Sequence, residues 1–135
     1  MMKIIIGVKG TGKTKTLIEM INSALESSKG SVVCIEKGSN LRLTLSYNCR
    51  LINSDEYLIK DAQSLYGFIA GLLASNHDIT DLFIDGTFRI CDRDLLAFDK
   101  FVIEADELCT RCGVNLVMTV SMPAENATDN IKKYL

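Results

Sequence analysis

The stretch that most constrains the fold is GVKGTGKT, residues 7–14, which separates an apolar run from a helical pattern. Residues 3–7 are short and rich in β-branched side chains, which predicts a buried strand. Residues 13–27 carry apolar side chains at spacings of three and four, which predicts an amphipathic helix. A strand followed by a helix is the repeating unit of parallel α/β folds, so we expect the rest of the chain to continue this alternation.

The remaining patterns do continue it. Apolar runs predict further strands over residues 31–36, 49–53, 81–85 and 114–120, and residues 41–47 alternate as in a half-exposed strand. Helical spacing covers residues 61–76 and 93–112, Gly30 is expected to end the first helix, and the tail after residue 120 is expected to form a short helix or cap. We therefore predict a three-layer α/β domain over residues 1–135, with a mostly parallel five-stranded sheet and helices on both faces.

Composition narrows the class of protein. The net charge of −2 gives no general attraction to nucleic acid or to an anionic membrane. The most apolar stretch, residues 65–74, is shorter than the roughly 20 residues that span a bilayer. Five cysteines without an export signal favour reduced thiols in the cytoplasm.

The glycine-rich stretch has a specific chemistry. Gly7, Gly12, Lys13 and Thr14 match the pattern G-x-x-x-x-G-K-[ST] at every fixed position. Glycines let backbone amides face one centre, and the following helix directs its positive end there, so the stretch is suited to phosphates. An incidental strand-to-helix turn is the alternative, but the predicted strand before it and helix after it favour phosphate binding. The predicted binding residues are Gly7, Val8, Lys9, Gly10, Thr11, Gly12, Lys13, Thr14 and Lys15.

On these residues the chain resembles the P-loop nucleoside triphosphatases, reduced to little more than their nucleotide-binding core over residues 1–121. It is also similar to small uncharacterised bacterial ATP-binding proteins that carry names borrowed from twitching-motility ATPases. The acidic and histidine boxes of those motors are not visible here, so we do not extend motility to this chain. The resemblance implies that Lys13 contacts the β- and γ-phosphates as a catalytic residue and that Thr14 binds Mg²⁺. The lack of an N-K-x-D tetrapeptide favours ATP over GTP.

A second magnesium ligand is expected at the end of an apolar strand, and Asp85 ends the run LFID. Asp85 is followed by Gly86, where relatives of the additional-strand branch carry a catalytic glutamate. In recombinase-like members the glutamate that activates water ends the strand after the first helix, which makes Glu36 the best substitute base. The ordinary alternatives are that Asp85 caps a turn and that Glu36 is solvated.

The additional-strand branch also implies an order of strands across the sheet. We expect residues 3–7, then 114–120, 81–85, 31–36 and 49–53, all parallel. Glu36 and Asp85 would then end neighbouring strands, on the edge where such sheets bind ligands.

Two functions follow from these predictions. The first is an ATPase that uses Mg²⁺, with a protein partner or a second copy of the chain as a possible coupling partner. The second is a binding module in which ATP switches contact with a partner and hydrolysis is vestigial. A small-molecule kinase is a weaker third hypothesis, because 135 residues leave little room for a lid and an acceptor pocket.

Other polar residues near the strand ends receive weaker predictions. Asp55 and Glu56 form a secondary candidate pair for the base. Thr119 and Ser121, at the end of the last strand, could contact the γ-phosphate as a polar sensor, although a buried hydroxyl with internal partners is the commoner situation.

Three further features are left outside the predicted site. Arg89 and Arg93 follow Asp85 closely and could contact phosphate or a neighbouring subunit, but solvated residues near the start of a helix are the commoner situation, so both are left out. Cys109 and Cys112 lie near a helix end with no second pair to complete a zinc site, so core packing is the preferred interpretation. The GxxxG spacing over residues 67–71 suggests a close backbone approach, with internal packing preferred over contact with a partner.

Overall fold

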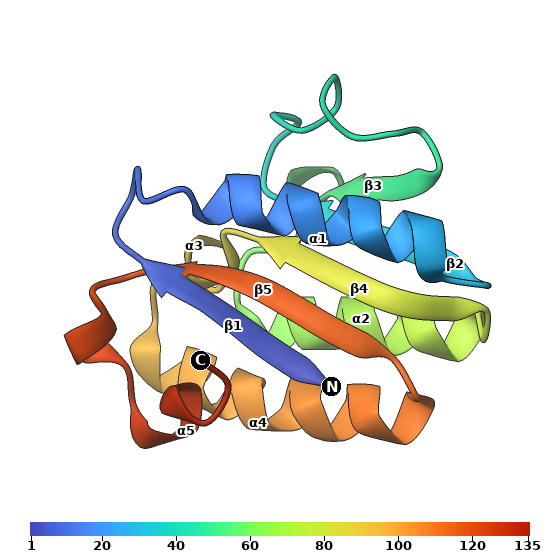
Figure 1. Cartoon of the computed structure of the whole chain (residues 1–135). Coiled ribbons are helices and arrows are strands. Elements are labelled where there is room, and N and C mark those ends of the chain that lie inside the picture. Colours follow the sequence, from blue (N-terminus) through green and yellow to red (C-terminus); the bar gives the residue numbers. More distant parts are fainter.

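The computed structural model describes all 135 residues and contains five strands that form one sheet (Figure 1). The strands are β1 (Met2–Gly7), β2 (Ser31–Glu36), β3 (Cys49–Asn53), β4 (Ile79–Asp85) and β5 (Asn115–Ser121). The helices are α1 (Lys13–Ser27), α2 (Ala62–Ser75), α3 (Thr87–Ile90), α4 (Leu95–Cys112) and α5 (Asp129–Lys132), with 3₁₀ turns at Ser54–Tyr57 and Ala124–Asn126.

All neighbouring strands are parallel, in the order β1-β5-β4-β2-β3. This confirms the α/β class and the strand order expected from the sequence. Because every strand runs the same way, all five carboxyl ends meet at one edge of the sheet. The register places Gly7 opposite Ser121 and Glu36 opposite Asp85 at that edge.

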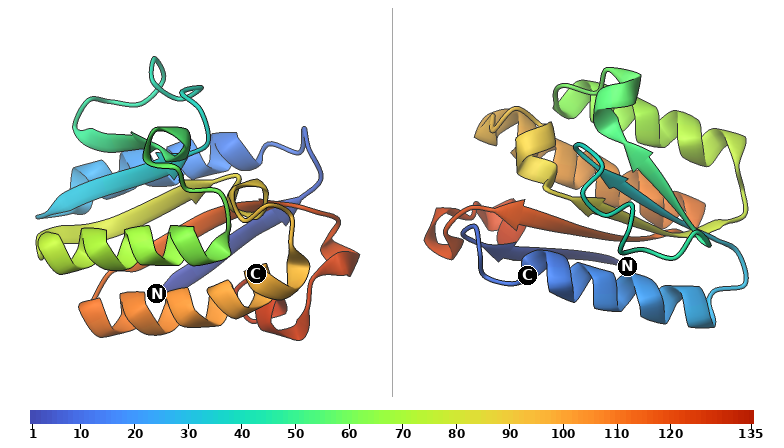
Figure 2. Two further views of the ribbon diagram at one scale, coloured as in Figure 1. Left: turned by 180° about the vertical axis from the view of Figure 1, so that it is seen from behind. Right: turned by 90° about the horizontal axis from the view of Figure 1, so that it is seen from above.

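Helices cover both faces of the sheet (Figure 2). The helix α1 lies alone on one face, where Leu17 and Ile21 pack with Phe83 of β4 and with other strand residues. The helices α2 and α4 cover the opposite face, which holds the larger core cluster, including Phe98. Successive residues of β4 divide between the two clusters, as the alternation of side chains along a strand requires.

The predicted strand over residues 41–47 is wrong. Residues 37–48 form an irregular connection of turns, in which Leu41 is buried while Leu43 and Tyr47 are almost fully exposed. Because β2 and β3 are parallel neighbours, the chain must return along the whole sheet between them, and such crossovers take a dozen or more residues. The segment is that return connection, and β2 already has a partner on each side.

Several helix ends also differ from the predictions. The helix α1 ends at Ser27 without using Gly30, and Ser28 N donates to the Ala24 carbonyl. A Cβ at Gly30 would overlap the Asp78 carbonyl, so the glycine allows a close approach of two connections. The one-turn helix α3 was not predicted.

Two predictions of internal packing are wrong for individual residues. Gly67 and Gly71 are exposed, and a Cβ at either position would meet no atom within 4 Å. Cys109 is buried in the core, as expected, whereas Cys112 is exposed at the end of α4.

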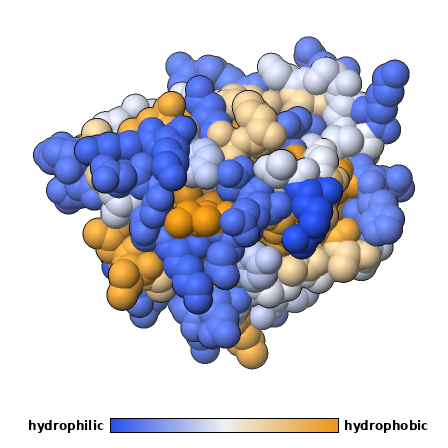
Figure 3. Space-filling model, turned by 90° about the horizontal axis from the view of Figure 1, so that it is seen from below, coloured by the Kyte–Doolittle hydropathy of each residue, from blue (hydrophilic) through white to orange (hydrophobic).

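The face formed by α4 and α5 is largely hydrophilic, with separate smaller apolar areas (Figure 3). The chain beyond α5 returns to the sheet, where the Tyr134 carbonyl accepts a hydrogen bond of 2.8 Å from Ile4 N in the edge strand β1. No helix combines the length and apolar character that crossing a membrane would require.

Candidate functional site

A cavity of about 690 Å³ lies at the carboxyl edge of the sheet. It brings together residues from the loop after β1 and from the ends of β2, β4 and β5. The lining residues are Val8, Lys9, Gly10, Gly12, Lys13, Thr14, Lys15, Glu36, Lys37, Asn40, Asp85, Gly86, Phe88, Arg89, Arg93, Thr119, Ser121, Met122 and Pro123. Of the predicted binding residues, Gly7 and Thr11 are not part of this lining. Asp55 and Glu56 do not line it either.

The loop after β1 depends on its glycines. Gly10 and Gly12 have φ angles of 85° and 84°, which residues other than glycine rarely adopt. Gly12 is the N-cap of α1, and no side chain caps the first amides of this 15-residue helix. The helix terminus therefore presents uncapped N–H groups and the positive end of its dipole beside the cavity.

Lys13 lies within this loop rather than in solvent. It is buried, and its Nζ donates a hydrogen bond of 2.9 Å to the Val8 carbonyl. Thr11 Oγ1 donates to the same carbonyl at 2.8 Å, so the two side chains close the loop upon itself. An ammonium group in this position keeps two further N–H donors for an anion in the cavity.

Asp85 is the centre of a polar cluster formed by three segments. Thr119 Oγ1 donates to Asp85 Oδ1 at 2.6 Å and accepts from Gly86 N at 2.8 Å. Thr14 Oγ1 lies 3.4 and 3.3 Å from the two carboxylate oxygens. The buried Thr119 side chain holds the Asp85 carboxylate through this hydrogen bond, while the Thr14 hydroxyl approaches the carboxylate from α1.

The Thr14 and Asp85 oxygens suit a hard cation. Neighbouring ligands of an octahedral Mg²⁺, at bond lengths of about 2.0–2.1 Å, lie about 3 Å apart, close to the observed separations. No group of three or more histidine, cysteine, aspartate or glutamate side chains is arranged for a metal. Mg²⁺ commonly takes one or two protein ligands and completes its shell with water and phosphate, so this small donor set fits it.

Glu36 is buried at the end of β2 and lines the same cavity. Its Oε1 accepts from Asn40 N at 3.2 Å, and its Oε2 accepts from Leu41 N at 2.9 Å. Burial raises the pKa of this carboxyl; the two amide bonds oppose that shift, Asp85 adds to it, and Arg89 opposes it. Glu36 thus lies beside Asp85 on the neighbouring strand. Its carboxylate also holds the start of the connection after β2.

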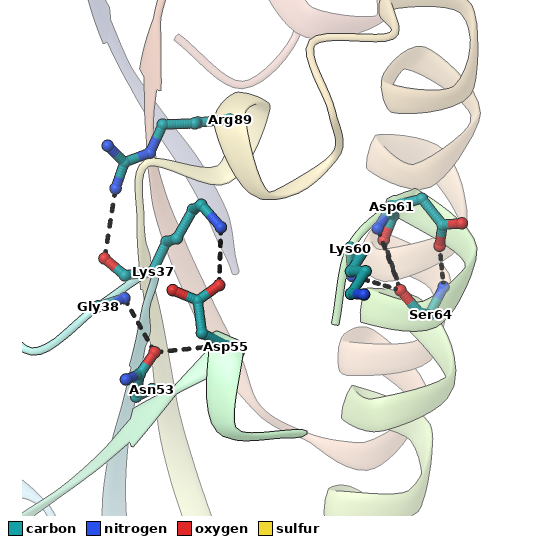
Figure 4. Close-up of polar contacts among 8 residues, drawn as sticks. All are labelled: Lys37, Gly38, Asn53, Asp55, Lys60, Asp61, Ser64 and Arg89. Atoms are coloured by element: carbon teal, nitrogen blue, oxygen red, sulfur yellow. Dashed lines mark hydrogen bonds and ion pairs between the residues drawn. The ribbon is translucent and has the colours of Figure 1, made fainter. Parts of the chain in front are cut away.

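The segment that follows Glu36 is held by further contacts (Figure 4). Lys37 Nζ pairs with Asp55 Oδ1 at 2.7 Å, and Asn53 Oδ1 accepts from Gly38 N at 2.9 Å. Arg89 Nη2 donates to the Lys37 carbonyl at 3.3 Å. Asp55 is therefore the ion-pair partner of Lys37, and it does not itself line the cavity.

Sequence reasoning missed two parts of this site. It did not foresee that Thr119 would bind Asp85 directly, because the predicted strand order did not fix the register of β5 beside β4. It also left out Arg89 and Arg93, which line the cavity because α3 turns the chain immediately after Asp85. The signal was the short spacing from Asp85 to Arg89, combined with Gly86, whose φ of 70° suits a tight turn.

No family model matches this sequence, and a search of the curated proteins also finds no match. The assignment of a function therefore rests on the residues gathered at the carboxyl edge.

Proposed function

We propose that this protein binds ATP with Mg²⁺ in the carboxyl-edge cavity and hydrolyses it, as a minimal P-loop nucleoside triphosphatase. The observation that carries the proposal is the meeting of Thr14, beside Lys13 in the glycine-rich loop, with Asp85 at 3.3 Å. Thr14 and Asp85 are 71 positions apart in the sequence. Together with Lys13 they would provide a phosphate-binding cation and two magnesium ligands in one cavity.

Each residue then has a defined task. The uncapped amides of α1 and the Lys13 ammonium bind the β- and γ-phosphates, and Thr14 and Asp85 hold the metal. Mg²⁺, when bound, neutralises charge that develops on the phosphates. Glu36 takes a proton from a water molecule, whose oxygen attacks the γ-phosphorus while the bond to the β–γ bridging oxygen breaks. The products are ADP and inorganic phosphate.

A second candidate function is a nucleotide-dependent binding switch, which the contacts of Glu36 favour. Both carboxylate oxygens already accept backbone amides from Asn40 and Leu41. Glu36 therefore has a structural task in holding the connection that exposes Leu43 and Tyr47. In this reading ATP changes the position of that connection and hence its contact with a protein partner or a second copy.

A turnover assay separates the two functions. The purified protein is incubated with ATP, with Mg²⁺ or with excess chelator, and released phosphate is measured. The ATPase proposal expects Mg²⁺-dependent release that Glu36→Gln slows by about 10²- to 10⁴-fold, the usual contribution of a general base. Glu26→Gln, an exposed change on α1, is the matched control and should leave the rate unchanged.

Three other results would change the assignment. Tight ATP binding without turnover would select the switch. Turnover that Glu36→Gln leaves intact would keep the ATPase and remove Glu36 as its base. Absence of nucleotide binding would refute both functions.

A further inference from the structure

We propose that Arg89 contacts the terminal phosphate of a bound nucleoside triphosphate and makes the site distinguish ATP from ADP. This inference rests on the proposed nucleotide binding and adds to it a residue that determines specificity for the triphosphate.

The position of α3 brings Arg89 to the cavity. Asp85 ends β4, Gly86 turns the chain with a φ of 70°, and the single turn of α3 follows at once. Arg89 therefore lines the same cavity as Lys13 and Thr14. A phosphate chain that lies along the loop and ends beside Thr14 would direct its last group towards the remaining walls, of which Arg89 is one.

The Arg89 guanidinium has N–H donors that are not used in hydrogen bonds within the protein. Its one hydrogen bond is the 3.3 Å contact from Nη2 to the Lys37 carbonyl, and it forms no ion pair. An arginine offers five N–H donors in a planar fork that matches phosphate oxygens. Burial raises the pKa of Glu36, and the charge of Arg89 opposes that rise, so Arg89 belongs to the same electrostatic centre as the proposed base.

A purely structural role for Arg89 is poorly supported by its surroundings. The segment that it contacts is already fixed by the ion pair of Lys37 with Asp55 and by the bond from Gly38 N to Asn53 (Figure 4). Losing a single exposed contact of 3.3 Å would leave both of these in place. The guanidinium is therefore available to exchange the Lys37 carbonyl for a stronger acceptor, and a phosphate dianion is such an acceptor.

The test compares two nucleotides in the presence of Mg²⁺, namely ADP and AMP-PNP, an analogue of ATP that resists hydrolysis. Binding to the unaltered protein, Arg89→Ala, Arg89→Lys and Arg111→Ala is measured by calorimetry. Arg111 is exposed in the last turn of α4, at the opposite edge of the sheet, so its variant makes the same charge change away from the cavity.

We expect the unaltered protein and Arg111→Ala to bind AMP-PNP more tightly than ADP. Arg89→Ala should weaken AMP-PNP binding by about 10- to 150-fold, the range for one charge-assisted hydrogen bond, and leave ADP binding unchanged. Arg89→Lys keeps the charge but loses the planar fork, so it should recover part of the preference for AMP-PNP.

The possible failures are distinct. If the unaltered protein binds both nucleotides and Arg89→Ala binds both as well as before, Arg89 does not contact the phosphate and the nucleotide site stands. Equal weakening of both nucleotides, with an unchanged thermal midpoint, would overturn the triphosphate-specific role. If the unaltered protein binds neither nucleotide, this inference and the proposed function both fail.

Discussion

The hydroxyl of Thr119 allows a sharp test of how the site is held together. The substitution Thr119→Val keeps the shape of this buried side chain and removes its hydroxyl. Two hydrogen bonds disappear with it, the 2.6 Å bond to Asp85 Oδ1 and the 2.8 Å bond from Gly86 N. A bond to a charged group contributes about 1.5–3 kcal/mol, and an N–H group left without a partner costs about 1–3 kcal/mol.

The added methyl group offsets about 0.8 kcal/mol of this loss. We therefore expect the free energy of unfolding to fall by about 2–5 kcal/mol, which lowers the thermal midpoint of a chain of this size by roughly 10–15 °C. Thr119→Ser, which keeps the hydroxyl, should lose less. The matched control is Thr110→Val on α4, where an exposed threonine donates to Asp106 at 3.3 Å; its effect should stay within about 0.5 kcal/mol. Urea denaturation that finds Thr119→Val as stable as Thr110→Val would refute the reasoning.

Three further predictions concern the loop, the thiols and the response to pH. Saturating Mg-ATP, at 100 times its dissociation constant, should stabilise the protein by about 2.7 kcal/mol, a shift of several degrees in a thermal melt, and Lys13→Ala should largely abolish that shift. Of the five free cysteines only Cys112 is exposed, and burial raises the pKa of Cys91 to about 12. A thiol reagent at pH 8 should therefore label one site quickly in the folded protein and five after denaturation, and fast labelling of a second site would contradict the packing described. Because burial raises the pKa of Glu36 and a base must be ionised, phosphate release should decline on acidification at a higher pH than an ordinary glutamate, near 4.3, would give; Glu36→Gln should lack that titration in a pH–rate profile.

The sequence carries more information on the sheet than on the site. Local patterns were sufficient for the five buried strands and for the glycine-rich loop, because a buried β-branched run and a pattern of fixed glycines each have few structural solutions. The order of strands came from the resemblance to the additional-strand branch rather than from local patterns. The connection after β2 was misread, because an alternation of apolar and polar residues looks the same whether or not a partner strand is available.

Individual side-chain contacts between strands were harder to predict than the order of the strands. Thr119 meets Asp85 through the register of β5 beside β4; the predicted strand order made these strands neighbours but did not say which of their residues would meet. Arg89 enters the cavity because one turn of helix follows β4, a detail finer than helical periodicity can resolve. The polar character of Thr119 and Arg89 could be recognised in the sequence, but the residues that they contact became known only from the fold.

Glu36 is the residue at which hydrolysis and switching can be one process. Each carboxylate oxygen has two lone pairs, so the bonds from Asn40 N and Leu41 N leave room for a water molecule. A carboxylate that takes the proton from that water loses its charge, and its bonds to the two amides lose the strength that the charge gave them. Turnover at such a residue would loosen the connection that carries Leu43 and Tyr47 through this protonation, whereas a switch would have to move the connection without it. The two proposed functions therefore differ in when the connection is released, during the chemical step in an ATPase or on nucleotide binding in a switch.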